Sequence, residues 1–256
     1  MEKKYVIDSH IHIEHQPYTL DTINNIVHYA MKNGVDEVWL VDHTHKFKEF
    51  KGIYAPVNKH DRARERFALK KMISIQEYLD FIDMVKSKEW PINIKFGLEV
   101  CYFKDTEMLI KELLEKYPFE IRIGSVHHTF NMPYDEVKEF WDDYQIDDMY
   151  HEYYKNNYSL IESKLFTHMG HPDAIKRFNH YPSYDLTEEY EKLAKMLVEY
   201  NLPTENNSGF ARYGFEVFGL GEKIKEVFKK YNVKILTSSD AHTADYVGYG
   251  FDKLNV

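Results

Sequence analysis

Short apolar runs alternate with helical patterns along the whole chain of 256 residues. After the first run, for example, apolar residues recur from Leu20 to Lys32 at the spacing of one helix face. This alternation is typical of βα units in a parallel sheet, and the length suits one barrel. We therefore predict a single α/β domain over residues 1–256. The seven strand-like runs are Tyr5 to Ile7, Val38 to Val41, Ile92 to Phe96, Glu120 to Ile123, Leu165 to Thr167, Leu202 to Glu205 and Val233 to Leu236.

Segments between these runs carry their own signals. Ser74-Ile75-Gln76-Glu77 has the pattern of a capping box and predicts a helix that runs to about Lys86. Residues 134–163 predict a helix whose aromatic stripe is packing surface. The charged segment from Thr44 to Met72 predicts an exposed loop or lid.

Composition narrows the function classes. A net charge of −9 argues against general binding of nucleic acid or anionic membranes. The single cysteine, Cys101, excludes an intrachain disulfide and fits a reducing cytoplasm. Only three apolar residues follow Met1-Glu2-Lys3-Lys4, which is too short for a signal peptide, and no apolar run is long enough to span a bilayer. We expect a cytoplasmic protein that acts on a small molecule and that could form homo-oligomers.

Residues able to bind metal follow nearly every strand-like run. Because the carboxyl ends of barrel strands meet at one face, these side chains should converge there. A lone histidine is more often a surface or core residue than a ligand, but recurrence at successive strand ends favours a site. Asp240 and His242 stand two residues apart, so in extended backbone they would point to the same side. The full set is His10, His12, His43, Glu99, His127, His171, Asn206, Asn207, Asp240 and His242.

The donor set exceeds the needs of one ion. Six imidazoles and two carboxylates are present, whereas a zinc ion takes three or four protein ligands. At least two ions with a bridging carboxylate are therefore expected. Nitrogen and oxygen donors without thiolate suit Zn, Mn or Fe. Paired ions can hold a hydroxide that attacks phosphorus in line.

These residues resemble the polymerase and histidinol phosphatase (PHP) family of metal-dependent phosphoesterases. The similarity extends over nearly the whole chain, and features around residues 117–127, 175–178 and 207–212 resemble its histidinol-phosphate phosphatase branch. The matching motifs, in the family's order, are Asp8-Ser9-His10-Ile11-His12, Asp42-His43, Gly97-Leu98-Glu99, Gly124-Ser125-Val126-His127, Gly170-His171-Pro172-Asp173 and Ser239-Asp240-Ala241-His242.

The resemblance implies a distorted (β/α)7 barrel and a trinuclear metal site. It assigns the first ion to His10, His12, Glu99 and Asp240, and the second to Glu99, His127 and His171. The third would take His43 and His242 with one more histidine. Tyr18 stands where many members place that histidine, so we expect nearby His15 to substitute, with Glu14 as a weaker candidate.

The resemblance also implies a reaction. Arg177 and Arg212 would hold the substrate phosphate, because guanidinium groups bind it in a bidentate manner. Glu99 and Asp240 are the catalytic candidates, together with Asp42, which could orient a neighbouring ligand or act as general acid. The expected reaction is hydrolysis of L-histidinol phosphate, a step of histidine biosynthesis, by a hydroxide that bridges two ions. Alternatives are hydrolysis of another sugar or nucleotide phosphate, an amidohydrolase-like deacylase and a non-catalytic module.

Overall fold

Seven parallel strands form the centre of the protein, and the predicted barrel is confirmed. The computed structural model describes residues 5–213 and 218–254, so Met1 to Lys4, used above in the signal-peptide argument, lie outside it. The sheet has the order β1-β2-β3-β4-β7-β8-β9. Its strands are β1 (Ile7–Ile11), β2 (Glu37–His43), β3 (Asn93–Cys101), β4 (Ile121–Ser125), β7 (His168–Met169), β8 (Thr204–Asn207) and β9 (Ile235–Ser238).

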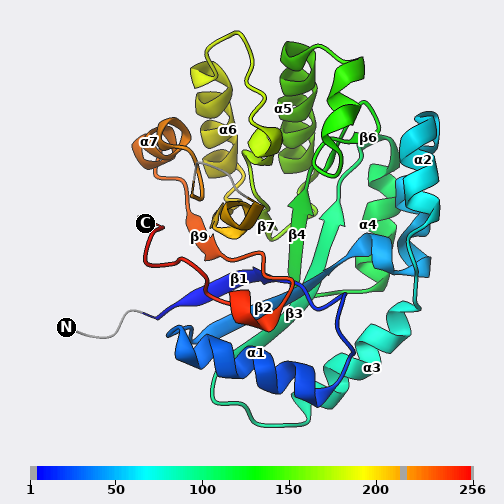
Figure 1. The fold of residues 1–256 in the computed structure, drawn as a ribbon, viewed down its shortest axis with the longest axis vertical. Coiled ribbons are helices and arrows are strands. Elements are labelled where there is room, and N and C mark those ends of the chain that lie inside the picture. The colour runs from blue at the N-terminus through cyan, green and yellow to red at the C-terminus, as the bar shows by residue number, and fades with distance from the viewer. Residues whose placement is uncertain (1–4, 214–217, 255–256) are drawn as a thin grey trace.

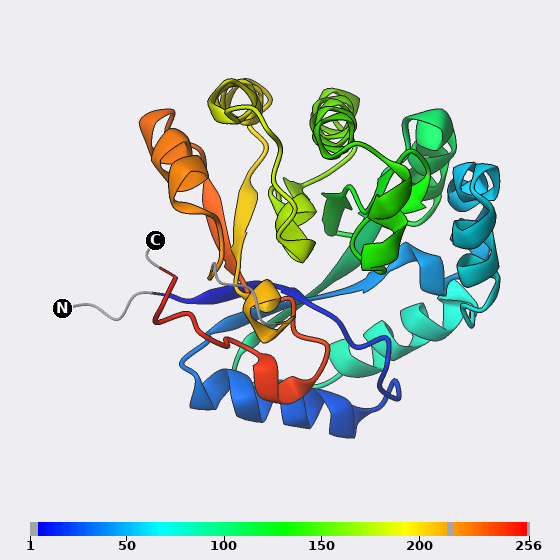
Figure 2. The ribbon, with the colours of Figure 1, turned by 45° about the horizontal axis from the view of Figure 1, so that its top comes forward.

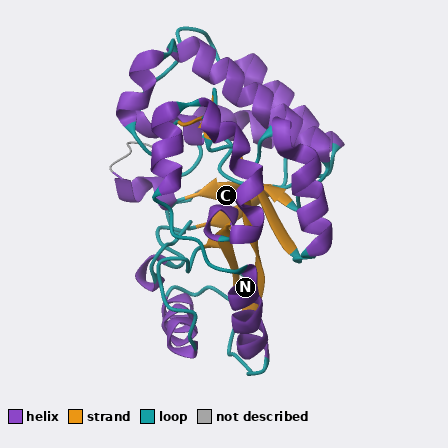
Figure 3. Ribbon diagram, turned by 90° about the vertical axis from the view of Figure 1, so that its right-hand side faces the viewer, coloured by secondary structure: helices purple, strands orange, loops and turns teal. Residues whose placement is uncertain are grey.

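Helices surround these strands on the outside, as Figures 1 and 3 show. In Figure 2 they follow one another around the sheet from the blue to the orange end of the colour scale. The helices are α1 (Leu20–Lys32), α2 (Asp61–Ala68), α3 (Ile75–Lys86), α4 (Glu107–Lys116), α5 (Ile146–Ser163), α6 (Thr187–Glu199) and α7 (Glu222–Lys230), and a small hairpin of β5 (His128–Thr129) and β6 (Met132–Pro133) follows β4. Within the described ranges no helix is long and apolar enough to cross a membrane.

The last strand returns to the first and nearly closes the barrel. The backbone N–H of His12 donates to the carbonyl of Ala241 at 2.7 Å, and Ile11 and Ala241 form a parallel bridge. Thr237 Oγ1 donates to the carbonyl of Ile7 at 2.7 Å. The two ends of the sequence therefore meet at the carboxyl ends of the strands.

Strand alternation sorts the side chains into two layers. On β2, Val38 and Leu40 point toward the helices, while Val41 belongs to a small apolar cluster with Ile121 and Ile123 inside the barrel. Since His43 lies two residues beyond Val41, it emerges on the inner face above this cluster. The register pairs His43 with Glu99 on β3, so both face the barrel interior.

Two sequence expectations need correction and one is confirmed. The segment from Thr44 to Met72 is not an exposed loop, because Lys48–Lys59 forms a 3-10 helix followed by α2, and Phe50, Ile53 and Val57 are buried. The helix expected over residues 134–163 begins only at Ile146. The capping box of Ser74 and Glu77 at the start of α3 is present as predicted.

Candidate metal centre

Glu99 lies at the centre of the cluster, in β3, and its side chain is only 1% exposed. One carboxylate oxygen, Oε1, faces two imidazoles, and the other, Oε2, faces three. A single carboxylate is therefore within contact distance of ligands from five different positions in the chain. The Nε2 atoms around Oε1 belong to His171 at 3.0 Å and His127 at 3.2 Å, and those around Oε2 belong to His43 at 2.8 Å, His10 at 3.3 Å and His12 at 3.3 Å.

Asp240 approaches the cluster from the loop after β9. Its Oδ1 lies 3.3 Å from His12 Nε2, and His10 Nε2 lies 3.0 Å from that same His12 atom. Asp240 has φ of +50°, which is left-handed backbone, so it does not project from an extended strand as expected. This turn nonetheless leaves Asp240 and His242 near one another, with Oδ1 3.8 Å from Nδ1.

A further group contains Glu14 in place of His15. The ligand atoms of His12, Glu14, His43 and His242 all lie within 4.8 Å of one another. Glu14 Oε2 lies 2.9 Å from His43 Nδ1, whereas the side chain of His15 is 71% exposed. The structure therefore favours Glu14, the second candidate from the sequence, over His15 for this group. His10, His12 and Glu14 are spaced two residues apart. The His15 ring lies at the edge of this group, with its centroid 6.0 Å from that of His242 and its Nε2 3.5 Å from Glu14 Oε1.

Asp42 does not face the cluster, because it alternates with His43 on β2. Its Oδ1 accepts from the backbone N–H of Ile13 at 2.9 Å, and Oδ2 accepts from Tyr18 at 2.5 Å and Lys46 at 3.3 Å. The carboxylate thus fixes the segment that carries Glu14. A general-acid role for Asp42 has no geometric support.

Glu205 supports the ligands and was missed in the sequence, where it ends an apolar run. Its Oε2 lies 3.0 Å from His10 Nδ1, and its Oε1 accepts from the backbone N–H of His171 at 2.9 Å. Asn207 donates from Nδ2 to Glu205 Oε1 at 2.9 Å and to Asp240 Oδ2 at 3.3 Å. A carboxylate on the second nitrogen of a ligand histidine fixes its tautomer and ring orientation. The available signal was the two-residue spacing of Glu205 and Asn207.

A glycine permits this close packing. A Cβ at Gly209 would lie 2.8 Å from the Cβ of Asp240 and 2.9 Å from Asn207 Oδ1. Its N–H donates to that same Asn207 oxygen at 2.7 Å. The side-chain amide of Asn207 is therefore held at both ends, and its Nδ2 is aimed at the carboxylates.

Electrostatics keep the central carboxylates ionised. Burial by itself would raise the pKa of Glu99, but the neighbouring His43, His10 and His127 hold that pKa well below its usual range. Burial also acts to raise the pKa of Glu205, but the charge and hydrogen bond of His10 outweigh it, so that this pKa is lowered. Burial lowers the pKa of His128, next to the cluster, to about 3, so its ring is neutral at pH 7.

The donor set fits divalent metal ions. Two ligands of a tetrahedral ion at ~2.1 Å are separated by about 3.4 Å. The contacts around Glu99 span 2.8 to 3.3 Å, which is close to this separation. Nitrogen and carboxylate donors without thiolate suit Zn, Mn or Fe. The cluster is therefore a metal-binding arrangement.

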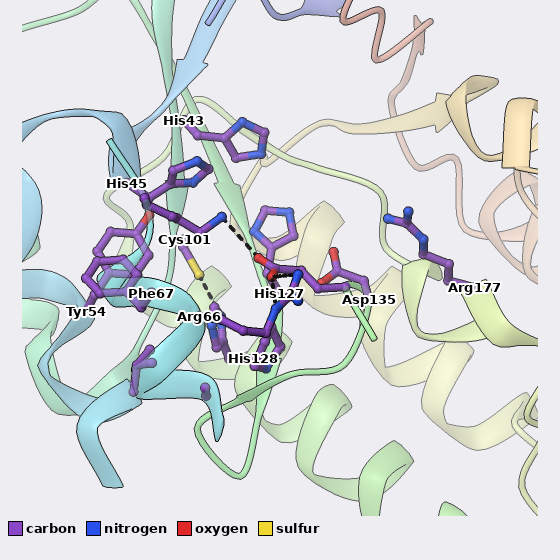
Figure 4. A pocket seen from close by; sticks show the side chains of 15 residues that line it. His43, His45, Tyr54, Arg66, Phe67, Cys101, His127, His128, Asp135 and Arg177 are labelled. Carbon is purple, nitrogen blue, oxygen red and sulfur yellow. Dashed lines mark hydrogen bonds and ion pairs between the residues drawn. The ribbon is translucent and has the colours of Figure 1, made fainter. Parts of the chain in front are cut away.

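A pocket opens beside the cluster, between α2, the end of β3 and the segment after β4. Figure 4 shows His43 and His127 on one side of it, with Arg177 on the opposite side. Tyr54, Phe67, His45 and His128 add aromatic surface. The pocket gives a small molecule access to the metal ligands.

The two predicted arginines lie in different places. Arg177 lines the pocket, whereas Arg212 donates from Nη2 to the carbonyl of Asp240 at 2.5 Å and lies over the ring of Tyr246. Lys176 is not a solvated charge, because its Nζ lies 3.1 Å from Asp173 Oδ2. Of the two predicted arginines, Arg177 is thus the one that borders the open pocket, which Arg66 also lines.

Fold and cluster together define an α/β-barrel protein whose metal ligands come from the carboxyl ends of its strands. The model of the PHP domain family matches residues 8–209. The chain therefore belongs to the PHP domain family.

Known proteins of similar length resemble the chain over most of its residues. The histidinol-phosphatase of Bacillus subtilis is 25% identical over 267 residues, which covers 96% of both chains. A solved structure from Listeria monocytogenes superimposes with a TM-score of 0.76, 18% identity and coverage of 97% of this chain and 99% of that one. Histidinol phosphate phosphatase from Lactococcus lactis, solved with Zn, L-histidinol and phosphate, has a TM-score of 0.67 and 19% identity, and the match covers 93% of this chain and 87% of that one. At these identities the structural matches establish the fold.

Proposed function

We propose that the protein is a phosphomonoesterase that hydrolyses L-histidinol phosphate to L-histidinol and phosphate in histidine biosynthesis. The observation that carries this proposal is a buried carboxylate, Glu99, in contact with five imidazoles beside a pocket lined by Arg177. The Bacillus subtilis relative named histidinol-phosphatase matches in sequence over 96% of its length, and the Lactococcus lactis relative was solved with Zn, L-histidinol and phosphate. Both observations support the same substrate.

The residues would hold two to three divalent ions, Zn, Mn or Fe. His10, His12, Glu99 and Asp240 would bind the first ion, and Glu99 would be shared with a second ion at His127 and His171. The group of Glu14, His43 and His242 would bind a third. Bound ions would lower the pKa of the attacking water and neutralise the phosphate oxygens.

The chain itself would supply orientation and charge. Glu205 and Asn207 hold His10 and Asp240 in position through the contacts described above. Arg177 reaches the pocket from beyond β7 and would bind a phosphate oxygen, whose charge must be stabilised in the transition state. Arg212 would contribute its charge from a separate position, on the carbonyl of Asp240.

We further propose that residues 1–256 act as one domain in the cytoplasm, without nucleic-acid partners. The thiol of Cys101 is buried and free, and the chain carries a net charge of −9. Both features suit a reducing compartment and a small-molecule substrate.

The test is steady-state phosphate release from L-histidinol phosphate beside a panel of sugar and nucleotide phosphates. We expect kcat/KM for histidinol phosphate to exceed that for each other ester by at least about tenfold, since each lost polar contact costs about that factor. A preference for another ester would refute the substrate. Failure of the metal-loaded protein to release phosphate from any ester would refute the reaction class.

A further inference from the structure

Two adjacent carboxylates, Asp135 and Glu136, line the pocket just after the hairpin of β5 and β6. Glu136 is already paired with two cations, one on α2 and one just after it. Its Oε2 lies 3.0 Å from Arg66 Nη2, and its Oε1 lies 3.1 Å from Lys70 Nζ. These contacts attach α2 to the far wall of the pocket. Glu136 therefore has a structural role.

Asp135 is placed differently. Among the described residues, no ion pair includes Asp135, whereas Arg66 and Lys70 both form ion pairs with the adjacent Glu136. Figure 4 shows Asp135 on the side of the pocket between His127 and Arg177. Asp135 therefore lines the same pocket as the candidate metal ligands His43 and His127.

A carboxylate in this position opposes the binding of a phosphate dianion. Like charges at short range repel, most strongly where water is excluded. Such a residue lowers the affinity for a simple phosphate ester unless the substrate brings a positive charge to meet it. Discrimination by a repulsive group against the wrong ligand is a common source of specificity.

We propose that Asp135 determines specificity by binding the ammonium group of the substrate, an inference that rests on the proposed function. In L-histidinol phosphate the ammonium is attached to the carbon next to the one that carries the ester oxygen. With the phosphate between His127 and Arg177, this ammonium lies on the wall that Asp135 occupies. The imidazole end then extends toward the aromatic wall of Tyr54, Phe67 and His128.

The experiment compares two esters and two variants of the full-length, metal-loaded protein. The esters are L-histidinol phosphate and its deamino analogue, which has hydrogen in place of the amino group. The variants are Asp135→Asn and, as a matched control, Glu136→Gln, which removes the same charge at the adjacent position. Metal content is measured for each protein, so that a lost ion is recognised directly.

We expect Asp135→Asn to raise KM for L-histidinol phosphate about 10- to 100-fold, the usual effect of losing a charge-assisted hydrogen bond. Its KM for the deamino analogue should stay within about threefold or fall, because a repulsive charge has been removed. Glu136→Gln should leave the ratio between the two esters unchanged.

Equal losses on both esters, or no loss on either, would overturn the assignment of Asp135 while leaving the proposed function intact. If the wild-type protein does not hydrolyse L-histidinol phosphate at all, the proposed function fails, and the assignment fails with it.

Discussion

Glu14 and His15 are neighbours in the sequence, but only Glu14 is buried against the candidate metal ligands. Its side chain is 5% exposed and contacts His43, whereas the ring of His15 lies largely in solvent. Residue type alone favours histidine at this position. The geometry favours the carboxylate, because it continues the two-residue spacing of His10 and His12.

The replacement Glu14→Gln should therefore lower the metal content by about one equivalent, since a neutral amide is a much weaker ligand than a carboxylate. His15→Ala is the matched control and should retain full occupancy. Elemental analysis of both proteins, purified without chelator, provides the measurement. Loss of metal from the His15 variant alone would restore the original assignment.

At the scale of elements, strand β8 connects ligands that come from three other parts of the barrel. Glu205 contacts the ring of His10 on β1 and the backbone of His171 after β7, and Asn207 reaches Asp240 after β9. Glu205 and Asn207 contribute to the site through these hydrogen bonds, without binding metal themselves. The strand fixes the orientation of residues that do.

We predict that Glu205→Gln weakens metal affinity or activity about 10- to 100-fold, as is usual when a carboxylate partner of a ligand histidine is lost. The isosteric change Thr204→Val, on the other face of the same strand, should have a much smaller effect on metal binding because Thr204 donates only to the carbonyl of Met169. Metal titration of the chelator-treated variants distinguishes them. Equal affinities in the two variants would show that Glu205 does not position His10.

The same scale explains what the sequence could and could not predict about the fold. The apolar runs indicated seven strands, and the family resemblance implied that they form a barrel. One run was misplaced, because Leu165 to Thr167 ends just before β7 begins at His168. However, β1 extends through His10 to Ile11, and β3 continues past Glu99 to Cys101. Polar ligands thus lie within the last part of these strands. A prediction based on apolar runs ends each strand before them. Phe50 and Ile53 are buried, but the charged residues around them in the sequence led us to predict an exposed loop.

Motifs also placed the candidate ligands at one end of the barrel. The structure brings together the six histidines, Glu99 and Asp240, with Asn207 beside them. Asn206 instead faces away from the cluster, where its Oδ1 accepts from the backbone N–H of Leu220 at 2.8 Å. The supporting residues were harder to find. Glu205 depends on contacts with residues 195 and 34 positions away. Asp135 differs from Glu136 in that Arg66 on α2 and Lys70 just after it pair only with Glu136. Pattern and spacing along the chain contain no information on such long-range pairs.

Across the whole molecule, closure of the barrel places the first and last motifs against each other. Asp8 is buried, and its two carboxylate oxygens accept from the backbone N–H groups of Ser239 at 2.9 Å and Gly248 at 2.8 Å. These bonds hold the loop of Asp240 and His242 next to His10 and His12. The complete cluster therefore depends on the folded barrel, because no single segment contains enough ligands.

The central claim is that this cluster hydrolyses a phosphate ester with bound metal. The most direct measurement is phosphate release from L-histidinol phosphate before and after chelator removes divalent ions, with metal content determined in parallel. We predict a loss of at least about 100-fold in kcat/KM on metal removal and recovery when Zn, Mn or Fe is returned, because metal activation of water and phosphate contributes several kcal/mol. Undiminished release by protein shown to be metal-free would contradict the account.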